Sequence, residues 1–254
     1  MKNLLNAKKL PVLTAALGGI GLVLRFVLYA IAVDGKNLLI AGHPVELLLW
    51  LVTLAAAVLV IAMVWKLDGS NRYADNFEVS LPAAVGAAAA AVGILLTVLL
   101  EEPAMPGYLG KAWLVLGILA AVSLGAIAKS RREGKRPFFV FHCVASVFYA
   151  VHMVSHYRSW SGNPQLQDYF FSLCGVLLLM LFGFYQSAFD VGAGKRRMQL
   201  SVGLLAAYCC MTSLSNTDYW LVYLTGGIWA LTNLCTLTPV PRRQKEAAPE
   251  EKKE

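Results

Sequence analysis

Charged residues are scarce in this chain. Asp, Glu, Lys and Arg together make up 15% of its 254 residues, whereas hydrophobic residues make up 58%. A soluble domain is usually about one quarter charged and about half apolar, because its surface must be hydrated. The mean hydropathy of +0.61 deviates in the same direction. The composition therefore argues against a soluble domain and predicts a protein embedded in a lipid bilayer.

Cysteine is also sparse, and its spacing does not match a disulfide framework or a metal site. All five cysteines lie within apolar runs, and Cys209 and Cys210 are adjacent, which is not a CxxC spacing. Buried cysteines usually act as small, polarizable packing residues. No nucleotide-binding motif occurs either. No cofactor is predicted, and any active transport would have to be coupled to an ion or depend on another subunit.

Long apolar runs account for most of the chain. A helix needs about 20 apolar residues to cross the hydrocarbon core of a bilayer. Eight segments approach this length: residues 11–33, 45–65, 80–100, 109–128, 137–157, 168–190, 198–216 and 219–238. We therefore expect an all-α membrane bundle of about eight transmembrane helices over residues 1–238. The last two segments are short and closely joined, so the sequence leaves open whether both cross the membrane.

The distribution of basic residues predicts the orientation. With both termini in the cytoplasm, 13 Lys and Arg residues fall in cytoplasmic segments, and three fall outside: Lys36, Lys111 and Arg158. Such a bias in short loops is the positive-inside signal. We therefore expect a multi-pass protein of the cell membrane, with a bacterial inner membrane as the default. Topology explains the basic residues, so the expected partner is the lipid bilayer and not nucleic acid.

The end of the chain differs from the rest. Residues 239–254 are charged, contain proline and lack aromatic residues. Such a segment cannot bury enough apolar surface to fold. We expect a disordered cytoplasmic tail.

An internal repeat is visible at a shift of 120 residues. Leu28-Tyr29-Ala30 then aligns with Phe148-Tyr149-Ala150, and Gly42-His43-Pro44 aligns with Gly162-Asn163-Pro164. Each half contains four predicted spans, so the two copies, residues 1–130 and 131–238, would share one orientation. Parallel repeats of this kind occur in some transporters.

The chain has only four histidines, and three of them lie in the apolar segment 137–157. His142, Tyr149, His152 and His156, together with Ala145, follow a 3-4-3-4 spacing. On a helix this spacing places them within an arc of roughly 80°. The opposite face is made of valines: Val140, Val144, Val147, Val151 and Val154. Ionisable groups within a span face the bundle interior and by default indicate a functional site.

Other polar residues lie within or near the predicted spans. Arg25 lies in the first span and needs a partner, which Glu46, Glu101 or Glu102 could supply; alternatively it binds an anionic group of a solute. Gln186 and Asp190 are four residues apart and share a helix face. Asp190 is interpreted as a boundary residue beside the following basic segment.

Transport is the leading hypothesis for the function. The predicted protein is a permease for a small solute, or one linked to ions or protons. Its ligand or proton pathway is expected to contain His142, Tyr149, His152, His156, Arg25 and Gln186. Histidine titrates near neutral pH and therefore suits a proton relay. No catalytic residue is assigned.

A membrane-embedded metal enzyme is the alternative. His152 and His156 are four residues apart and could bind one zinc ion from a single helix face. The third ligand would come from His43, Glu101 or Glu102. However, Met153 stands where the HExxH motif has its glutamate.

A non-catalytic membrane subunit or sensor is a third class of function. Its basic loops and charged tail would dock a cytoplasmic partner. A homo-oligomer or a complex with a partner subunit is compatible with the sequence.

Overall fold

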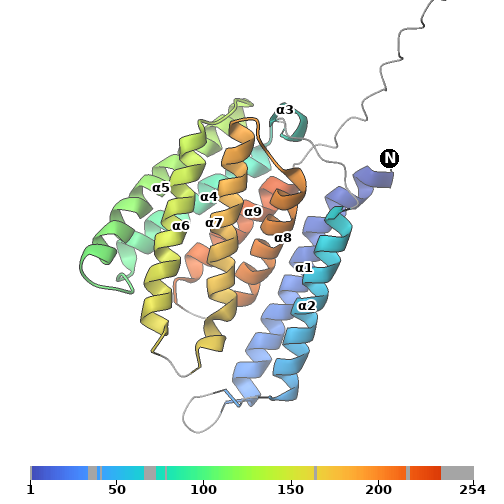
Figure 1. Ribbon diagram of the computed structural model, residues 1–254, viewed down its shortest axis with the longest axis vertical. Coiled ribbons are helices and arrows are strands. Elements are labelled where there is room, and N and C mark those ends of the chain that lie inside the picture. Colours follow the sequence, from blue (N-terminus) through green and yellow to red (C-terminus); the bar gives the residue numbers. More distant parts are fainter. Residues whose placement is uncertain are drawn as a thin grey trace, which may run out of the picture.

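The computed structural model describes residues 2–33, 39–40, 42–65, 73–77, 79–162, 165–215 and 218–235 (Figure 1). These residues form helices and no strand. The elements are α1 (Lys2–Ile31), α2 (Pro44–Trp65), α3 (Tyr73–Asn76), α4 (Leu81–Leu100), α5 (Tyr108–Glu133), α6 (Phe139–Trp160), η1 (Leu166–Tyr169), α7 (Phe170–Asp190), α8 (Arg196–Ser213) and α9 (Trp220–Cys235). A helix lies at each of the eight predicted places. The predicted tail at 239–254 lies outside the described residues.

Local sequence signals account for several helix boundaries. The hydroxyl of Ser80 accepts a hydrogen bond from the backbone N–H of Ala83 at 3.2 Å and caps α4. Pro82 follows in the first turn, where its missing N–H has no cost. Gly134 ends α5 with a φ of 69°, a left-handed conformation that glycine adopts without strain.

Six of the helices, α1, α2, α4, α5, α6 and α7, are long and apolar enough to cross a membrane. Their outer faces expose large apolar side chains, for example Leu54 and Val122, each 67% exposed. A soluble protein rarely exposes such extensive apolar surface, because water disfavours it. The fold is therefore that of a multi-pass α-helical membrane protein.

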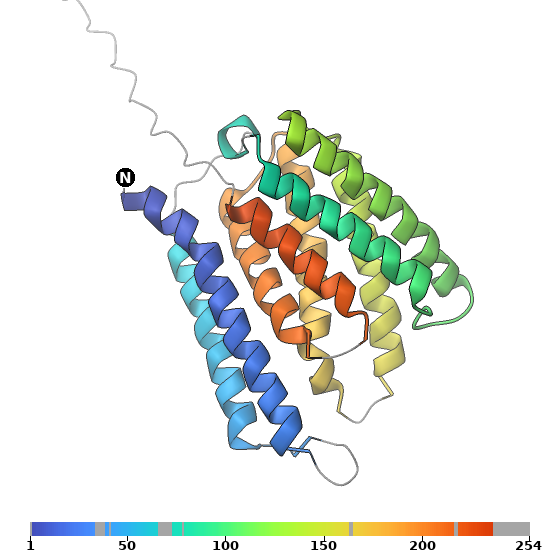
Figure 2. The same cartoon turned by 180° about the vertical axis from the view of Figure 1, so that it is seen from behind.

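The last two helices are shorter and lie inside the bundle. They have 18 residues (α8) and 16 residues (α9) and do not belong to the six long apolar helices. α8 packs against α1, α2, α7 and α9, and α9 packs mainly against α4 and α8. Figure 2 shows both between the α1–α2 pair and the α4–α5 pair. The polar side chains of α8, such as Gln199 and Thr212, are buried by these neighbours.

Successive helices run in opposite directions (Figures 1 and 2). The two ends of the bundle differ in the residues that they carry. The first, here the α3 end, carries α3 and two buried arginines. Arg131 donates to the Tyr73 hydroxyl at 3.3 Å, and Arg196 donates to the Asn76 side-chain oxygen at 2.8 Å. The opposite end, here the pocket end, contains the last residues of α4, α6 and α8.

The predicted 120-residue repeat remains a prediction. In the described part of the chain, α6, α7, α8 and α9 pack in succession. In the first half, by contrast, α2 packs against α1 and α8, and α4 packs against α5 and α9. The two halves therefore differ in their helix neighbours. One of the two aligned turns, at Asn163 and Pro164, lies outside the described residues.

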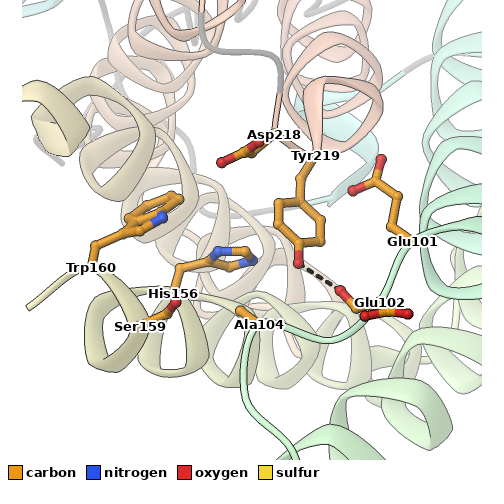
Figure 3. A pocket seen from close by; sticks show the side chains of 8 residues that line it. All are labelled: Glu101, Glu102, Ala104, His156, Ser159, Trp160, Asp218 and Tyr219. Carbon is orange, nitrogen blue, oxygen red and sulfur yellow. Dashed lines mark hydrogen bonds between the residues drawn. The ribbon is translucent and has the colours of Figure 1, made fainter. Parts of the chain in front are cut away.

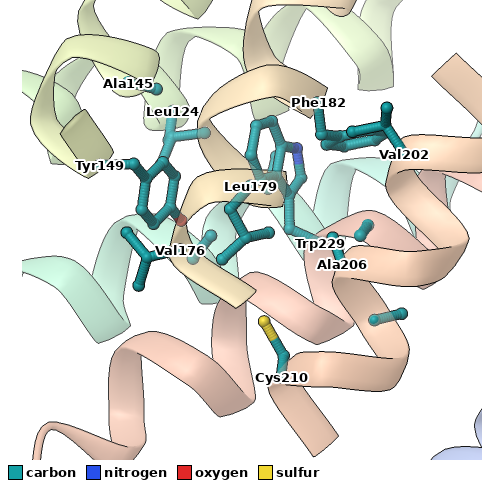
Figure 4. Packing of buried hydrophobic residues seen from close by; sticks show 14 of the residues in the cluster. Leu124, Ala145, Tyr149, Val176, Leu179, Phe182, Val202, Ala206, Cys210 and Trp229 are labelled. Carbon is teal, nitrogen blue, oxygen red and sulfur yellow. The ribbon is translucent and has the colours of Figure 1, made fainter. Parts of the chain in front are cut away.

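The main core is built mostly from α4 to α9, and the fully buried Trp229 of α9 lies within it (Figure 4). Phe182 contacts Trp229 edge-on at a centroid distance of 5.0 Å, and Tyr149 lies parallel to it at 6.4 Å. α4 approaches α9 closely because it presents glycine there. A Cβ atom at Gly93 would overlap the side chain of Thr225. Small residues of this kind allow close packing between membrane helices.

Candidate functional site

The predicted stripe of α6 faces the interior. His142, Tyr149, His152 and His156 have exposed fractions of 3%, 0%, 0% and 1%, respectively. On the opposite face, Val147 is 48% exposed and Val154 is 43% exposed. This burial pattern agrees with the inward face that the 3-4-3-4 spacing predicted.

Two of these histidines form a close pair. The rings of His152 and His156 lie 4.1 Å apart between centroids, because residues four apart are neighbours on one helix face. The indole N–H of Trp113 on α5 donates a hydrogen bond to Nδ1 of His152 at 3.0 Å. In a neutral imidazole the proton is then on Nε2. The contact with Trp113 could not be predicted from the sequence, because it depends on how α5 packs against α6.

Three nitrogen atoms of this pair are buried without a hydrogen-bond partner in the described structure. They are Nε2 of His152 and both ring nitrogens of His156. The hydroxyl of Tyr149, one to two turns earlier in α6, is also buried and has no partner among the described residues. Buried polar groups are nearly always hydrogen-bonded, so each exception requires an explanation.

A cavity of about 430 Å³ opens above His156 at the pocket end (Figure 3). Its lining comes from three parts of the chain: the end of α6, the α4–α5 connection and the α8–α9 connection. The lining residues are Glu101, Glu102, Ala104, His156, Ser159, Trp160, Asp218 and Tyr219. We call this cavity the acidic pocket. Sequence reasoning proposed His156, Glu101 and Glu102 as candidates but missed Asp218 and Tyr219.

Tyr219 covers the histidine pair. Its ring lies 4.2 Å from that of His156 between centroids, at an interplanar angle of 75°, and its hydroxyl donates to the backbone carbonyl of Glu102 at 2.6 Å (Figure 3). The φ of Tyr219 is 57°, a region that a bulky residue rarely occupies. Such strain tends to occur at functional sites.

The carboxyl groups of the acidic pocket influence one another. Burial, and then the charge of Asp218, raise the pKa of Glu101 above its usual value of 4.5. Burial, and then the charges of Glu101, Asp218 and Glu102, raise the pKa of Tyr219 to about 12. The three carboxylates therefore lie close enough to Tyr219 for their charges to add to the effect of burial on its hydroxyl.

At the α3 end, the stripe ends in a histidine–carboxylate pair. Nδ1 of His142 lies 2.6 Å from Oδ2 of Asp190 on α7, and both side chains are buried. The sequence suggested that Asp190 is a boundary residue, but its carboxylate is buried and contacts His142. The signal was present: His142 lies near the start of α6 and Asp190 at the end of α7, at similar depth in two consecutive antiparallel helices. Gln186, one turn away on α7, is buried, and its Nε2 has no partner among the described residues.

Arg25 is held by oxygen atoms of neutral groups. Its Nη2 donates to the Tyr29 hydroxyl at 2.7 Å and to the backbone carbonyl of Asp168 at 2.5 Å. Its Nη1 donates to the backbone carbonyl of Thr212 at 3.4 Å.

The expectation of a partner among Glu46, Glu101 and Glu102 was therefore wrong. Packing of α1 against α8 brings the carbonyl of Thr212 to the guanidinium instead. Glu46 accepts a hydrogen bond from the exposed N–H of Gly42 at 3.0 Å, and Glu101 and Glu102 line the acidic pocket.

The structure brings Glu101 and Glu102 to the same pocket as His156, whereas His43 does not line it. His43 lies at the start of α2, where its Nδ1 accepts a hydrogen bond from the N–H of Val45 at 3.3 Å. Among the described residues, no group of three or more His, Cys, Asp or Glu side chains could hold a metal ion. The zinc site formed by His152 and His156 therefore remains an untested hypothesis.

No protein-family model matches this chain, and neither a curated protein nor a solved structure matches it. Its class is defined by its fold: a multi-pass α-helical membrane protein. Its described part contains a buried histidine pair, His152 and His156, beneath an acidic pocket.

Proposed function

We propose that this protein is a proton-linked permease for a small solute. In this proposal it lies in the cell membrane with both termini in the cytoplasm, and α8 and α9 are two further, centrally placed crossings. The basic residues of the α3 end support this orientation, because cytoplasmic loops accumulate Lys and Arg. The acidic pocket then opens to the outside.

The unpartnered polar atoms of α6 are the observation that carries this proposal. Leaving a buried donor or acceptor without a partner costs about 1–3 kcal/mol. Four such atoms lie on one face of α6: the hydroxyl of Tyr149, Nε2 of His152 and both ring nitrogens of His156. A protein that only packed its helices would gain stability by replacing these groups with apolar ones. A row of them is expected where water, protons or a solute are bound in turn.

The two ends of the stripe are suited to exchanging protons. His156 meets the acidic pocket, and His142 meets Asp190 at the α3 end. Chains of histidines and carboxylates serve as proton relays in membrane pumps and transporters. Tyr149 is seven residues from each end, about 10 Å along the helix axis. Water or a side-chain movement must bridge these intervals.

Transport by reconstituted protein tests this proposal. The protein would be placed in liposomes on a solid-supported membrane, and currents would be recorded with amines, amino acids, carboxylates and sugars at acidic and neutral pH. At least one solute is expected to give a protein-dependent current together with proton movement, recorded with an internal pH dye. H152Q and H156Q should lower this current about tenfold or more, as expected for loss of a proton-transfer group.

The fourth histidine provides the control. H43Q changes the same residue type outside the stripe, so it should transport as the wild type does. Melting temperatures of all variants would identify folding defects. The absence of any current above that of empty liposomes would overturn the proposal, as would folded H152Q and H156Q variants that transport normally.

A further inference from the structure

The acidic pocket has a marked charge preference. Among the described residues, its lining contains three carboxylates, from Glu101, Glu102 and Asp218, and no Lys or Arg. All three carboxylates line one cavity, and burial followed by their charges raises the pKa of Tyr219. Such a pocket attracts cations and repels anions.

The floor of the acidic pocket offers an acceptor of hydrogen bonds. His156 is 1% exposed and lines the pocket, and both of its ring nitrogens lack a partner within the described structure. A neutral imidazole has one acceptor nitrogen and one N–H donor. The acceptor nitrogen needs a donor, and a ligand in the pocket can provide it when the Tyr219 ring that covers His156 moves aside.

Aromatic rings form the walls. Tyr219 lies against His156, and Trp160 lies 4.8 Å from His156 between ring centroids. Trp160 is itself held in place by Tyr169, which stacks on it at 4.2 Å with an interplanar angle of 15°. The face of an aromatic ring attracts a cation, and the attraction is strongest for tryptophan.

We infer that the acidic pocket binds a primary ammonium group, with His156 accepting one of its N–H bonds and the carboxylates of Glu101 and Asp218 balancing its charge. This inference rests on the proposed function, because it names the class of solute that enters the pathway. A primary ammonium has several N–H donors and can satisfy the imidazole and a carboxylate together. A quaternary ammonium has the charge but no donor, and a carboxylate solute has the wrong charge. The cavity of about 430 Å³ suits a small amine.

Equilibrium binding tests the inference without requiring transport. Isothermal titration calorimetry on the full chain in lipid nanodiscs would compare n-butylammonium with tetramethylammonium, n-butanol and butyrate. Butylammonium is expected to bind at least about tenfold more tightly than each of the others, since it alone combines charge with N–H donors. Butyrate binding as tightly as butylammonium, or no butylammonium binding up to about 10 mM, would overturn the inference, because a paired charge should exceed millimolar affinity.

Variants assign the roles. E101Q and D218N should each weaken butylammonium binding about tenfold, because each removes one charge that attracts the ligand. The matched control is E133Q, which changes an exposed glutamate paired with Lys135 beyond the other end of the bundle. H156L should reduce the preference for butylammonium over tetramethylammonium, because the imidazole acceptor is lost while the carboxylate acceptors remain. The hydrogen-bonding role is disproved if a folded H156L variant keeps this preference undiminished.

The two proposals fail differently. If another solute gave currents but butylammonium did not bind, the permease proposal would be supported and the ammonium site would be disproved. If butylammonium bound selectively but no solute gave a current, the ammonium site would be supported and the permease proposal would be disproved.

Discussion

Nδ1 of His142 on α6 lies 2.6 Å from Oδ2 of Asp190 on α7. This contact joins two neighbouring helices at the α3 end of the polar stripe. The exposed fractions of the two residues are 3% and 5%. The other carboxylate oxygen of Asp190 has no hydrogen-bond partner in the part of the chain that the structure describes. The buried carboxylate therefore depends on His142 for its hydrogen bond.

Loss of His142 should destabilise the protein strongly. H142A leaves the Asp190 carboxylate buried and unpaired, which typically costs about 3–5 kcal/mol. D190N retains a hydrogen-bonding group without the charge and should cost less. Unfolding in a detergent titration measures both values. H43A provides the comparison, because His43 makes only a local contact; equal stabilities of H142A and H43A would contradict the role of the pair.

Arg25 should stabilise the fold through its fork of hydrogen bonds. R25K retains the charge but cannot reproduce the geometry that reaches Tyr29, Asp168 and Thr212. We expect R25K to cost about 1–3 kcal/mol, since buried carbonyl acceptors lose their donors. Thermal unfolding would measure this change. E46Q should leave the free energy of unfolding nearly unchanged. If E46Q destabilised the protein as much as R25K does, the result would support the ion pair of Arg25 with Glu46 that the sequence suggested.

The contact between α4 and α9 should tolerate no side chain at Gly93. In G93A the new methyl group overlaps Thr225, and overpacking of this kind costs about 1–3 kcal/mol. G125A is the matched control, because a Cβ atom there meets no atom within 4 Å. The double variant G93A/T225A should recover most of the loss, as measured by thermal unfolding. A double variant as unstable as the sum of the two single variants would contradict this packing account.

Binding of butylammonium should weaken as the pH falls. Ionised Glu101 attracts the cation, and its pKa is raised by burial and by Asp218, although the backbone of Tyr219 hydrogen-bonds to it. The carboxyl therefore becomes protonated above pH 4.5, and binding is lost as the pH decreases through this raised pKa. Glu102, His156 and the Tyr219 hydroxyl also face this space. The hydroxyl, with a pKa of about 12, remains protonated throughout.

Calorimetry in buffers of different ionisation enthalpy would measure this effect. A bound cation favours the ionised form of Glu101, so binding should release protons in mildly acidic buffer. E101Q should abolish most of this release. Proton release that is unchanged in E101Q would assign the effect to another group.

Most helices could be predicted because their signals are local. The segment predicted at 45–65 corresponds to α2, Pro44–Trp65, and the segment predicted at 80–100 corresponds to α4, Leu81–Leu100. Length and apolar composition suffice for such predictions. The periodicity of α6 also predicted which of its faces is buried. The predicted repeat, the orientation and the transport function were not decided in this way and remain predictions.

The site was only partly predictable, because it combines residues distant in the sequence. His152 and His156 were found from their spacing on one helix. Trp113 and Tyr219 could not be found, because each reaches the pair from another helix or connection. The partner of Arg25 was predicted incorrectly for the same reason: the guanidinium meets the carbonyl of Thr212, 187 residues away.

The sequence by itself thus determined the membrane class, the helices and the inward face of α6, since these follow from composition and from the helical period. Only the tertiary structure decided which helices are neighbours. Apolar helices offer similar surfaces to lipid and to one another, so hydrophobicity does not select among arrangements. The arrangement depends instead on close steric fits, such as Gly93 with Thr225, and on buried polar contacts, such as His142 with Asp190. These contacts exist only when the whole bundle has assembled.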